Sequence, residues 1–142
     1  MTDLNETKGW YRYRDAIGAS TRLAQQHEDK KALELLDDAI ASAVDEGEYR
    51  WVLTLSHHAA VIARFIGDWP RVRRYYEKSL AVNPENAQAF SGLADVAQEQ
   101  GDFEQAKQYA ARCYKSLTQG DDFLREARIE TLLKKWPDVA SY

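Results

Sequence analysis

Apolar and small residues recur every three or four positions along most of the chain, in helix-length segments that short turns separate. The strong turn signals come at near-regular intervals, and they are Gly47-Glu48, Gly67-Asp68, Asn83-Pro84, Gly101-Asp102 and Gly120-Asp121. The segments between them are rich in Ala, Leu, Glu, Gln, Lys and Arg, which favour helix. The pattern predicts an all-α chain with helices at 6–27, 29–45, 48–66, 69–82, 86–100, 103–117 and 122–135.

Three of the turns end in an aspartate that can cap the next helix, namely Asp68, Asp102 and Asp121. A carboxylate at this place accepts hydrogen bonds from backbone N–H groups of the first turn, which have no partner inside the helix. Short loops between long helices make consecutive helices antiparallel neighbours. The chain is therefore expected to be either a helical bundle or an array of helical hairpins.

An internal period of 34 residues favours the array of hairpins. When 87–120 is laid over 53–86, Gly101-Asp102-Phe103 falls on Gly67-Asp68-Trp69, and Tyr109 falls on Tyr75. A third copy fits 13–46. The six additional residues between the first two copies, 47–52, are interpreted as a turn and a lengthened helix.

Small residues repeat with the same period, which has a direct packing interpretation. The eighth position of the copies holds Ser20, Ala60 and Ala94, and the twentieth holds Ala32, Val72 and Ala106. Small side chains at these places allow the two helices of a hairpin to approach closely. Because one hairpin cannot bury its apolar face alone, each is expected to stack on the next.

This pattern resembles the tetratricopeptide repeat, a 34-residue helix–turn–helix unit. The resemblance is clearest in the copy at 87–120, through Phe90, Leu93-Ala94, Gly101-Asp102 and Ala106. The copies depart from the family pattern at Ser56, Ala110 and Thr118, where an aromatic, an aromatic and a proline are usual.

The resemblance implies a single domain over 1–142, built as a right-handed α-solenoid of three hairpins and a C-terminal capping helix at 122–135. Members of the family are typically adaptors or scaffolds that hold peptides or partner proteins in a concave groove and catalyse nothing themselves. The resemblance places one set of residues in this groove, on the first helix of each hairpin: Arg14, Thr21, Thr54, His57, Val61, Arg64, Gln88, Ser91 and Asp95.

The chemistry of this groove argues against one ligand class and favours another. A subclass of the family binds a C-terminal carboxylate with Lys, Asn and Arg, but this chain has Ile17, Thr21, Val61, Ser91 and Asp95 at those positions. The clamp is absent, which argues against chaperone-tail binding. His57, Val61 and Arg64 share one helix face with Arg14 nearby, and this set suits an acidic or phosphorylated segment. An ordinary solvated face explains the same residues equally well.

The composition excludes several other classes. The chain has 142 residues, a formal net charge of −4 and one cysteine, so an internal disulfide and a zinc site built on several cysteines are both excluded. The N-terminal residues have no apolar stretch typical of a signal peptide, and no segment is apolar enough to span a membrane. We therefore expect a cytoplasmic protein with no membrane partner. The acidic balance argues against nucleic acid as a partner.

The remaining reactive residues have ordinary structural interpretations. His57 and His58 point about 100° apart on a helix and cannot share a metal ion from one face. Cys113 falls at a small core position, as expected of an inert thiol. The basic cluster Arg71, Arg73, Arg74 and Lys78 falls on an outer helix, where a solvated face is expected and nucleic-acid binding is the alternative. No nucleophile, acid–base pair or phosphate loop is recognisable, so neither catalysis nor a cofactor is expected.

The predicted C-terminal helix carries apolar residues on two nearly opposite sides. Phe123, Leu124 and Ala127 form one side, which can pack back on the third hairpin. The other side needs a cover from the tail at 137–142 or from another molecule, and its residues are Ile129, Leu132, Leu133 and Trp136. This second set is the predicted interface of a symmetric homodimer, and self-assembly through it is the alternative to peptide binding.

Overall fold

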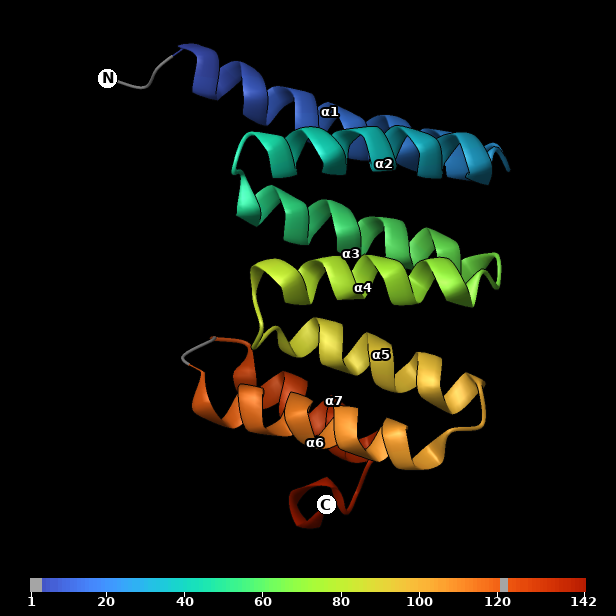
Figure 1. Cartoon of the computed structure of the whole chain (residues 1–142), viewed down its shortest axis with the longest axis vertical. Coiled ribbons are helices and arrows are strands. Elements are labelled where there is room, and N and C mark those ends of the chain that lie inside the picture. The colour runs from blue at the N-terminus through green and yellow to red at the C-terminus, as the bar shows by residue number, and fades with distance from the viewer. Residues whose placement is uncertain (1–3, 121–122) are drawn as a thin grey trace. The chain divides into compact units, whose positions relative to one another are not determined.

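Seven α-helices and one short 3₁₀ helix make up residues 4–120 and 123–142, which a computed structural model describes, with side chains from Tyr11 onward (Figure 1). The elements are α1 (Leu4–Gln25), α2 (Asp29–Asp45), α3 (Tyr49–Phe65), α4 (Trp69–Val82), α5 (Ala87–Glu99), α6 (Phe103–Gln119), α7 (Arg125–Lys135) and the 3₁₀ helix Val139–Ser141. These residues contain no strand, so the all-α prediction is confirmed. None of the described helices has the length and apolar composition needed to cross a bilayer.

The predicted helix boundaries agree with the observed ones to within two residues, except at the start of α7. Two of the predicted caps are present: Asp68 accepts a hydrogen bond from the Arg71 N–H at 3.2 Å, and Asp102 accepts one from the Gln105 N–H at 3.1 Å. The third predicted cap, Asp121, lies outside the described residues. These local sequence signals account for the starts of α4 and α6.

The contacts within the chain define two compact units, one that runs to Val82 and one from Asn83 to Tyr142. In the first unit, α1 pairs with α2 and α3 with α4, and α3 also packs on α2 and contacts α1 (Figure 1). In the second unit, α5 pairs with α6, on which α7 and the 3₁₀ helix pack. Each predicted repeat copy thus corresponds to one hairpin. The six additional residues, 47–52, form the turn before α3 and the start of that helix. As a result α3 has 17 residues, whereas α5 has 13.

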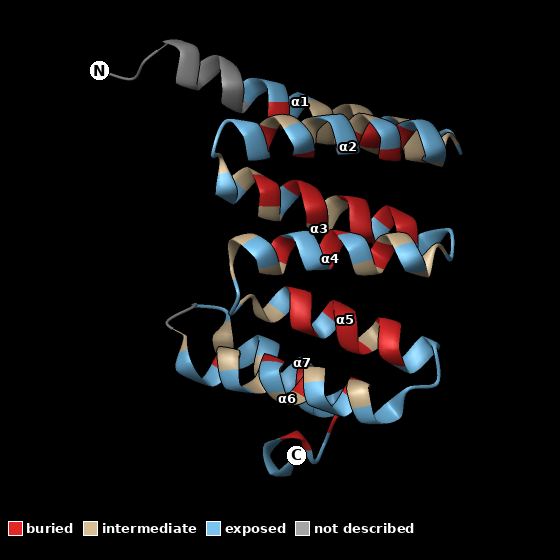
Figure 2. Cartoon of the chain, in the orientation of Figure 1, coloured by how far each residue is buried: buried red, intermediate tan, exposed pale blue. Residues whose placement is uncertain are grey.

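The repeated small positions lie where the packing argument places them (Figure 2). Each of these six side chains is at most 1% exposed: Ser20, Ala32, Ala60, Val72, Ala94 and Ala106. The core around them is aliphatic and aromatic, with Leu33, Leu36 and Leu55 in the first unit and Leu93 in the second among the most buried side chains. Burial of these residues is the main favourable contribution to folding.

A polar contact joins α1 to the turn between α2 and α3. Tyr13 is fully buried, and its hydroxyl donates a hydrogen bond to Glu46, which also pairs with Arg12. The hydrogen bond from Tyr13 holds the pKa of Glu46 below its usual value. This contact helps to set the position of α1 within the first unit.

Four helix–helix turns contain a residue in the left-handed region, and three of these residues are glycines. Gly47, Gly67 and Gly101 have φ of 70°, 73° and 78°, and the fourth residue is His27, with φ of 62°. In each turn the next N–H donates to a carbonyl five residues earlier, as when Glu28 donates to Leu23 at 2.8 Å. This hydrogen bond is typical of a helix C-terminus closed by a left-handed residue. His27 therefore ends α1, although the sequence pattern placed it inside the first helix.

Replacing His27 with glycine is expected to raise the free energy of unfolding by about 0.5–1 kcal/mol, because a Cβ is unfavourable at positive φ. Urea unfolding followed by circular dichroism measures the change. The matched control, Gly67→Ala, should instead lower the free energy of unfolding by about 1 kcal/mol. No atom lies within 4 Å of a Cβ built on Gly67, so this cost comes from the backbone alone. A loss of stability in His27→Gly would mean that the imidazole makes a compensating contact.

Candidate binding surface

One face of α3 carries four of the residues that the resemblance assigns to a groove. Thr54, Val61 and Arg64 are exposed on it, and His57 is half-buried. Their spacing of three or four residues places them along one side of the helix. The same side continues to Phe65, which is 84% exposed, while Val61 is 49% exposed. An exposed phenylalanine next to an exposed valine forms an apolar strip at the end of α3.

The sequence gives α3 an unusual charge. No Asp or Glu occurs between Tyr49 and Phe65, although the whole chain has a net charge of −4. Arg50 and Arg64 are both exposed on this helix. The Arg64 guanidinium lies 5.7 Å from the centre of the Trp69 ring, a geometry that favours a cation–π contact. Arg64 therefore lies next to the apolar strip, on a helix that contains no carboxylate.

His57 has a packing partner in addition to its place on this face. Its Nδ1 lies 3.3 Å from the hydroxyl of Tyr76 on α4, and the two rings are 6.2 Å apart. Tyr76 is buried, so the hydrogen bond fixes the orientation of the imidazole between α3 and α4. His57 therefore contributes to the packing of its hairpin as well as to the exposed face, which the sequence pattern did not indicate.

His58, which the sequence analysis did not include in the groove, connects α3 to α1. The hydroxyl of Thr21 donates to the carbonyl of Ile17 at 2.9 Å, so it can only accept from the His58 Nε2, which is 3.1 Å away. Burial lowers the pKa of His58 and so favours the neutral ring, and the contact with Thr21 then selects the tautomer with its proton on Nε2. Thr21 is thus partly used inside the unit, whereas Arg14 on the same helix is exposed. His57 and His58 face different helices, α4 and α1.

The three predicted groove residues of the third hairpin lie on α5, in the second unit. Gln88 and Ser91 are exposed, and Asp95 is half-buried. Asp95 accepts a hydrogen bond from the Lys135 ammonium group on α7, which also forms a salt bridge with it. The carboxylate is therefore paired inside its own unit.

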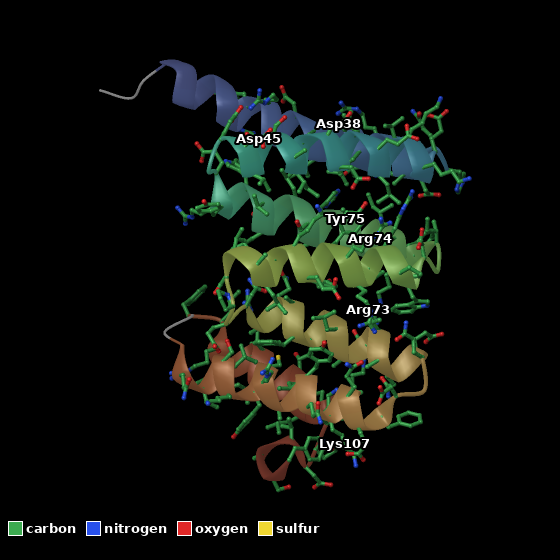
Figure 3. The ribbon with its side chains drawn as sticks, viewed as in Figure 1. Asp38, Asp45, Arg73, Arg74, Tyr75 and Lys107 are labelled. Atoms are coloured by element: carbon green, nitrogen blue, oxygen red, sulfur yellow. The ribbon has the colours of Figure 1, made fainter. Side chains whose placement is uncertain are left out.

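Two residues of the basic cluster, Arg74 and Lys78, lie on the side of α4 that meets α2. Arg74, Tyr75 and Lys78 line a small cavity of about 170 Å³ together with Asp37 and Ile40 of α2. Figure 3 labels Arg74 and Tyr75, which belong to α4. Tyr75 donates to the Asp37 carboxylate at 2.7 Å, and burial together with this carboxylate raises the pKa of Tyr75. The cluster therefore lies next to a carboxylate, which lowers its attraction for anions such as nucleic acid.

Cys113 is buried on α6, as its core position predicted. Burial raises the pKa of its thiol to about 11. The thiolate form needed for reaction is therefore scarce at neutral pH, which agrees with an inert thiol.

The structure corrects the prediction for the two sides of the C-terminal helix. Phe123 and Leu124 precede α7 in a turn and are 94% and 44% exposed, and Ala127 on α7 is also exposed, so the prediction that these three pack on the third hairpin is wrong. Leu132 and Trp136 from the opposite side are buried instead. The physical reason is that α7 begins only at Arg125, so Phe123 and Leu124 are not on the helix, and Leu132 and Trp136 bury more apolar area against the hairpin than Ala127 could.

The C-terminal residues complete the cover over this buried side. The 3₁₀ helix packs on α6 with Val139 buried, and the ring of Tyr142 meets that of Trp136 edge-on at 6.3 Å. Lys107, labelled in Figure 3, lies 5.7 Å from the centre of the Tyr142 ring. Of the four residues predicted for a dimer interface, Ile129 is half-buried and Leu133 is exposed. Only these two stay available for a contact between copies.

Part of the chain matches the model of a known protein family. Residues 67–115 match the family model described as tetratricopeptide repeat. The chain contains a tetratricopeptide repeat. This match covers most of the third copy of the sequence pattern, so the predicted resemblance is confirmed. No curated protein gives a significant match in sequence.

Two solved structures resemble the whole chain. The type III secretion translocator chaperone SycD of Yersinia enterocolitica, in an alternative dimer, has a TM-score of 0.65 at 11% identity, over 87% of this chain and 89% of that one. The C-terminal TPR-containing domain of a candidate FK506-binding protein of Plasmodium falciparum has a TM-score of 0.63 at 13% identity, over 99% and 98%. These likenesses show the fold alone, and they agree with the predicted all-α fold of the α-solenoid class.

Proposed function

We propose that this tetratricopeptide-repeat protein is an adaptor that binds an acidic segment of a partner protein on the exposed face of α3. The observation that carries the proposal is the pair Val61 and Phe65, exposed beside Arg64 on a helix without a carboxylate. Exposed apolar side chains that charged groups flank are typical of protein-binding sites. Arg14 on α1 adds a further cation within the same unit.

The fold supports a protein as the partner. The structurally similar SycD is described as a chaperone of a translocator, hence as a protein that acts on another protein. By the same proposal, the chain binds without catalysing a reaction, needs no cofactor and works in the cytoplasm. Carboxylates of the partner would pair with the guanidinium groups, and its apolar side chains would cover Val61 and Phe65.

The test selects random peptides displayed on phage against the intact chain and measures the affinity of selected peptides by fluorescence anisotropy. We expect enriched sequences with Asp or Glu next to large apolar residues. Arg64→Glu should weaken their binding at least about tenfold, because it places a like charge in the site. Val61→Asp should do the same by removing apolar contact.

The matched control is Arg74→Glu, which makes the same charge change on exposed α4. It should leave the affinity within about twofold, because Arg74 lines the cavity beside Asp37 of α2 and is not one of the residues of the exposed α3 face. Circular dichroism verifies that all three variants stay folded. Equal affinity of wild type and Arg64→Glu for every selected peptide would move the binding site away from α3.

A second candidate function is self-assembly through α7. The observation that favours it is the exposure of Leu133 on a helix that otherwise packs on α6. SycD is described as an alternative dimer, so a chain of this fold does associate with itself.

A further inference from the structure

A shallow apolar groove runs along α7 beside the side that packs on α6. Its volume is about 410 Å³, and it is lined by Ile129 and Leu133 together with Glu126, Glu130 and Lys134. Leu133 is 37% exposed, and Ile129 is half-buried. Because the charged side chains present their methylene stems to it, the floor of the groove is apolar and its rim is charged.

The groove is lined by residues of α7 alone, so within the described residues no other helix lies along this side of α7. Each of α1, α3 and α5 packs against the helix that follows it. After α7, the next element within the described residues is the three-residue helix Val139–Ser141, and it packs on α6. A helix from another molecule can therefore take this place without displacing a helix of the hairpins.

The charges on the rim indicate which helix fits. Going along α7, two carboxylates, Glu126 and Glu130, come before one ammonium group, Lys134. Glu130 and Lys134 approach to 3.8 Å, but both are about three-quarters exposed, so this pair contributes little within the chain. Lys134 is therefore available for a second carboxylate.

We infer that the occupant is α7 of a second copy of this chain, in antiparallel orientation about a two-fold axis. In this arrangement Ile129 of the first copy faces Leu133 of the second copy. Lys134 of the second copy then lies level with position 128 of the first copy, between its Glu126 and Glu130. A two-fold axis makes every such contact twice, so four apolar side chains and two sets of opposite charges meet in one interface.

The apolar area is small, so the dimer is of the weak class that buries less than about 1,200 Å². It forms at high protein concentration. The inference rests on the self-assembly proposed above and not on the peptide site, since Val61, Arg64 and Phe65 lie on α3 in the other unit.

The experiment is sedimentation equilibrium of the full chain from about 10 µM to about 1 mM, with circular dichroism to check folding. We expect the wild type to move from monomer towards dimer over this range. Leu133→Glu should stay monomeric, whereas the control Val44→Glu, at an exposed position on α2, should associate like the wild type. Lys134→Glu should weaken association at least about tenfold, because each added carboxylate then meets two others.

A charge exchange tests the antiparallel register itself. The triple variant Glu126→Lys, Glu130→Lys, Lys134→Glu restores the complementary pattern with the signs reversed, and it should associate within about threefold of the wild type. A wild type that is monomeric throughout the range overturns the inference. So does a dimer that Leu133→Glu leaves intact, since it would use another surface. Failure of the triple variant to regain association, when Lys134→Glu has lost it, overturns the antiparallel arrangement.

Discussion

Replacing Leu55 with alanine is expected to lower the free energy of unfolding by about 2–5 kcal/mol, the usual range for a fully buried leucine. Leu55 is 0% exposed on α3, and this helix packs against both α2 and α4. Truncation would therefore leave a cavity where two hairpins meet, and neighbouring side chains cannot fill it without moving a helix. Denaturant unfolding measures the change.

Leu53→Ala is the matched control for this prediction. Leu53 lies on the same helix and is only half-buried, so the same truncation should cost clearly less. Equal losses at both positions would mean that the interior of the first unit relaxes to fill the cavity.

Replacing Ala60 or Ala94 with leucine is expected to cost about 1–3 kcal/mol through overpacking. Both residues are 1% exposed and lie at the same repeat position, on α3 and on α5. Each helix packs on its hairpin partner, α4 or α6, and a longer side chain would force the pair apart. Because the two sites lie in different units, similar losses would show that the same packing rule operates in both.

Ala81→Leu is the control for the overpacking prediction. Ala81 is exposed on α4, so the added carbons meet solvent and stability should change by no more than about 0.5 kcal/mol. A neutral result at both Ala60 and Ala94 would contradict the repeat register on which the hairpin assignment depends.

Much of the fold could be predicted because its signals are local or periodic. The turn residues Gly67 and Gly101, each followed by a capping aspartate, mark the ends of helices whatever the rest of the chain does. His27 was missed because histidine is not a turn signal by itself. Its relation to the other turns could have been found by aligning His27-Glu28 with Gly47-Glu48, since both precede a helix that starts two residues later.

The candidate site was predictable only in part. The repeat register places Val61 and Arg64 on one face, and the structure leaves both exposed. The contact of His57 with Tyr76 and that of His58 with Thr21 join residues 19 and 37 positions apart. Such contacts depend on how the hairpins pack, so no local pattern gives their geometry.

The sequence by itself determined that this chain is a series of helical hairpins with the tetratricopeptide-repeat pattern. Helix periodicity, left-handed turns and small residues at the helix crossings are each properties of a few neighbouring residues. Only the tertiary structure decided which side of α7 is buried. Its two apolar sides were equally acceptable for an isolated helix, and the choice depends on the surface of α6 and on Val139 and Tyr142, which cover Trp136. Burial is a property of the assembled neighbours, and a helix alone does not contain it.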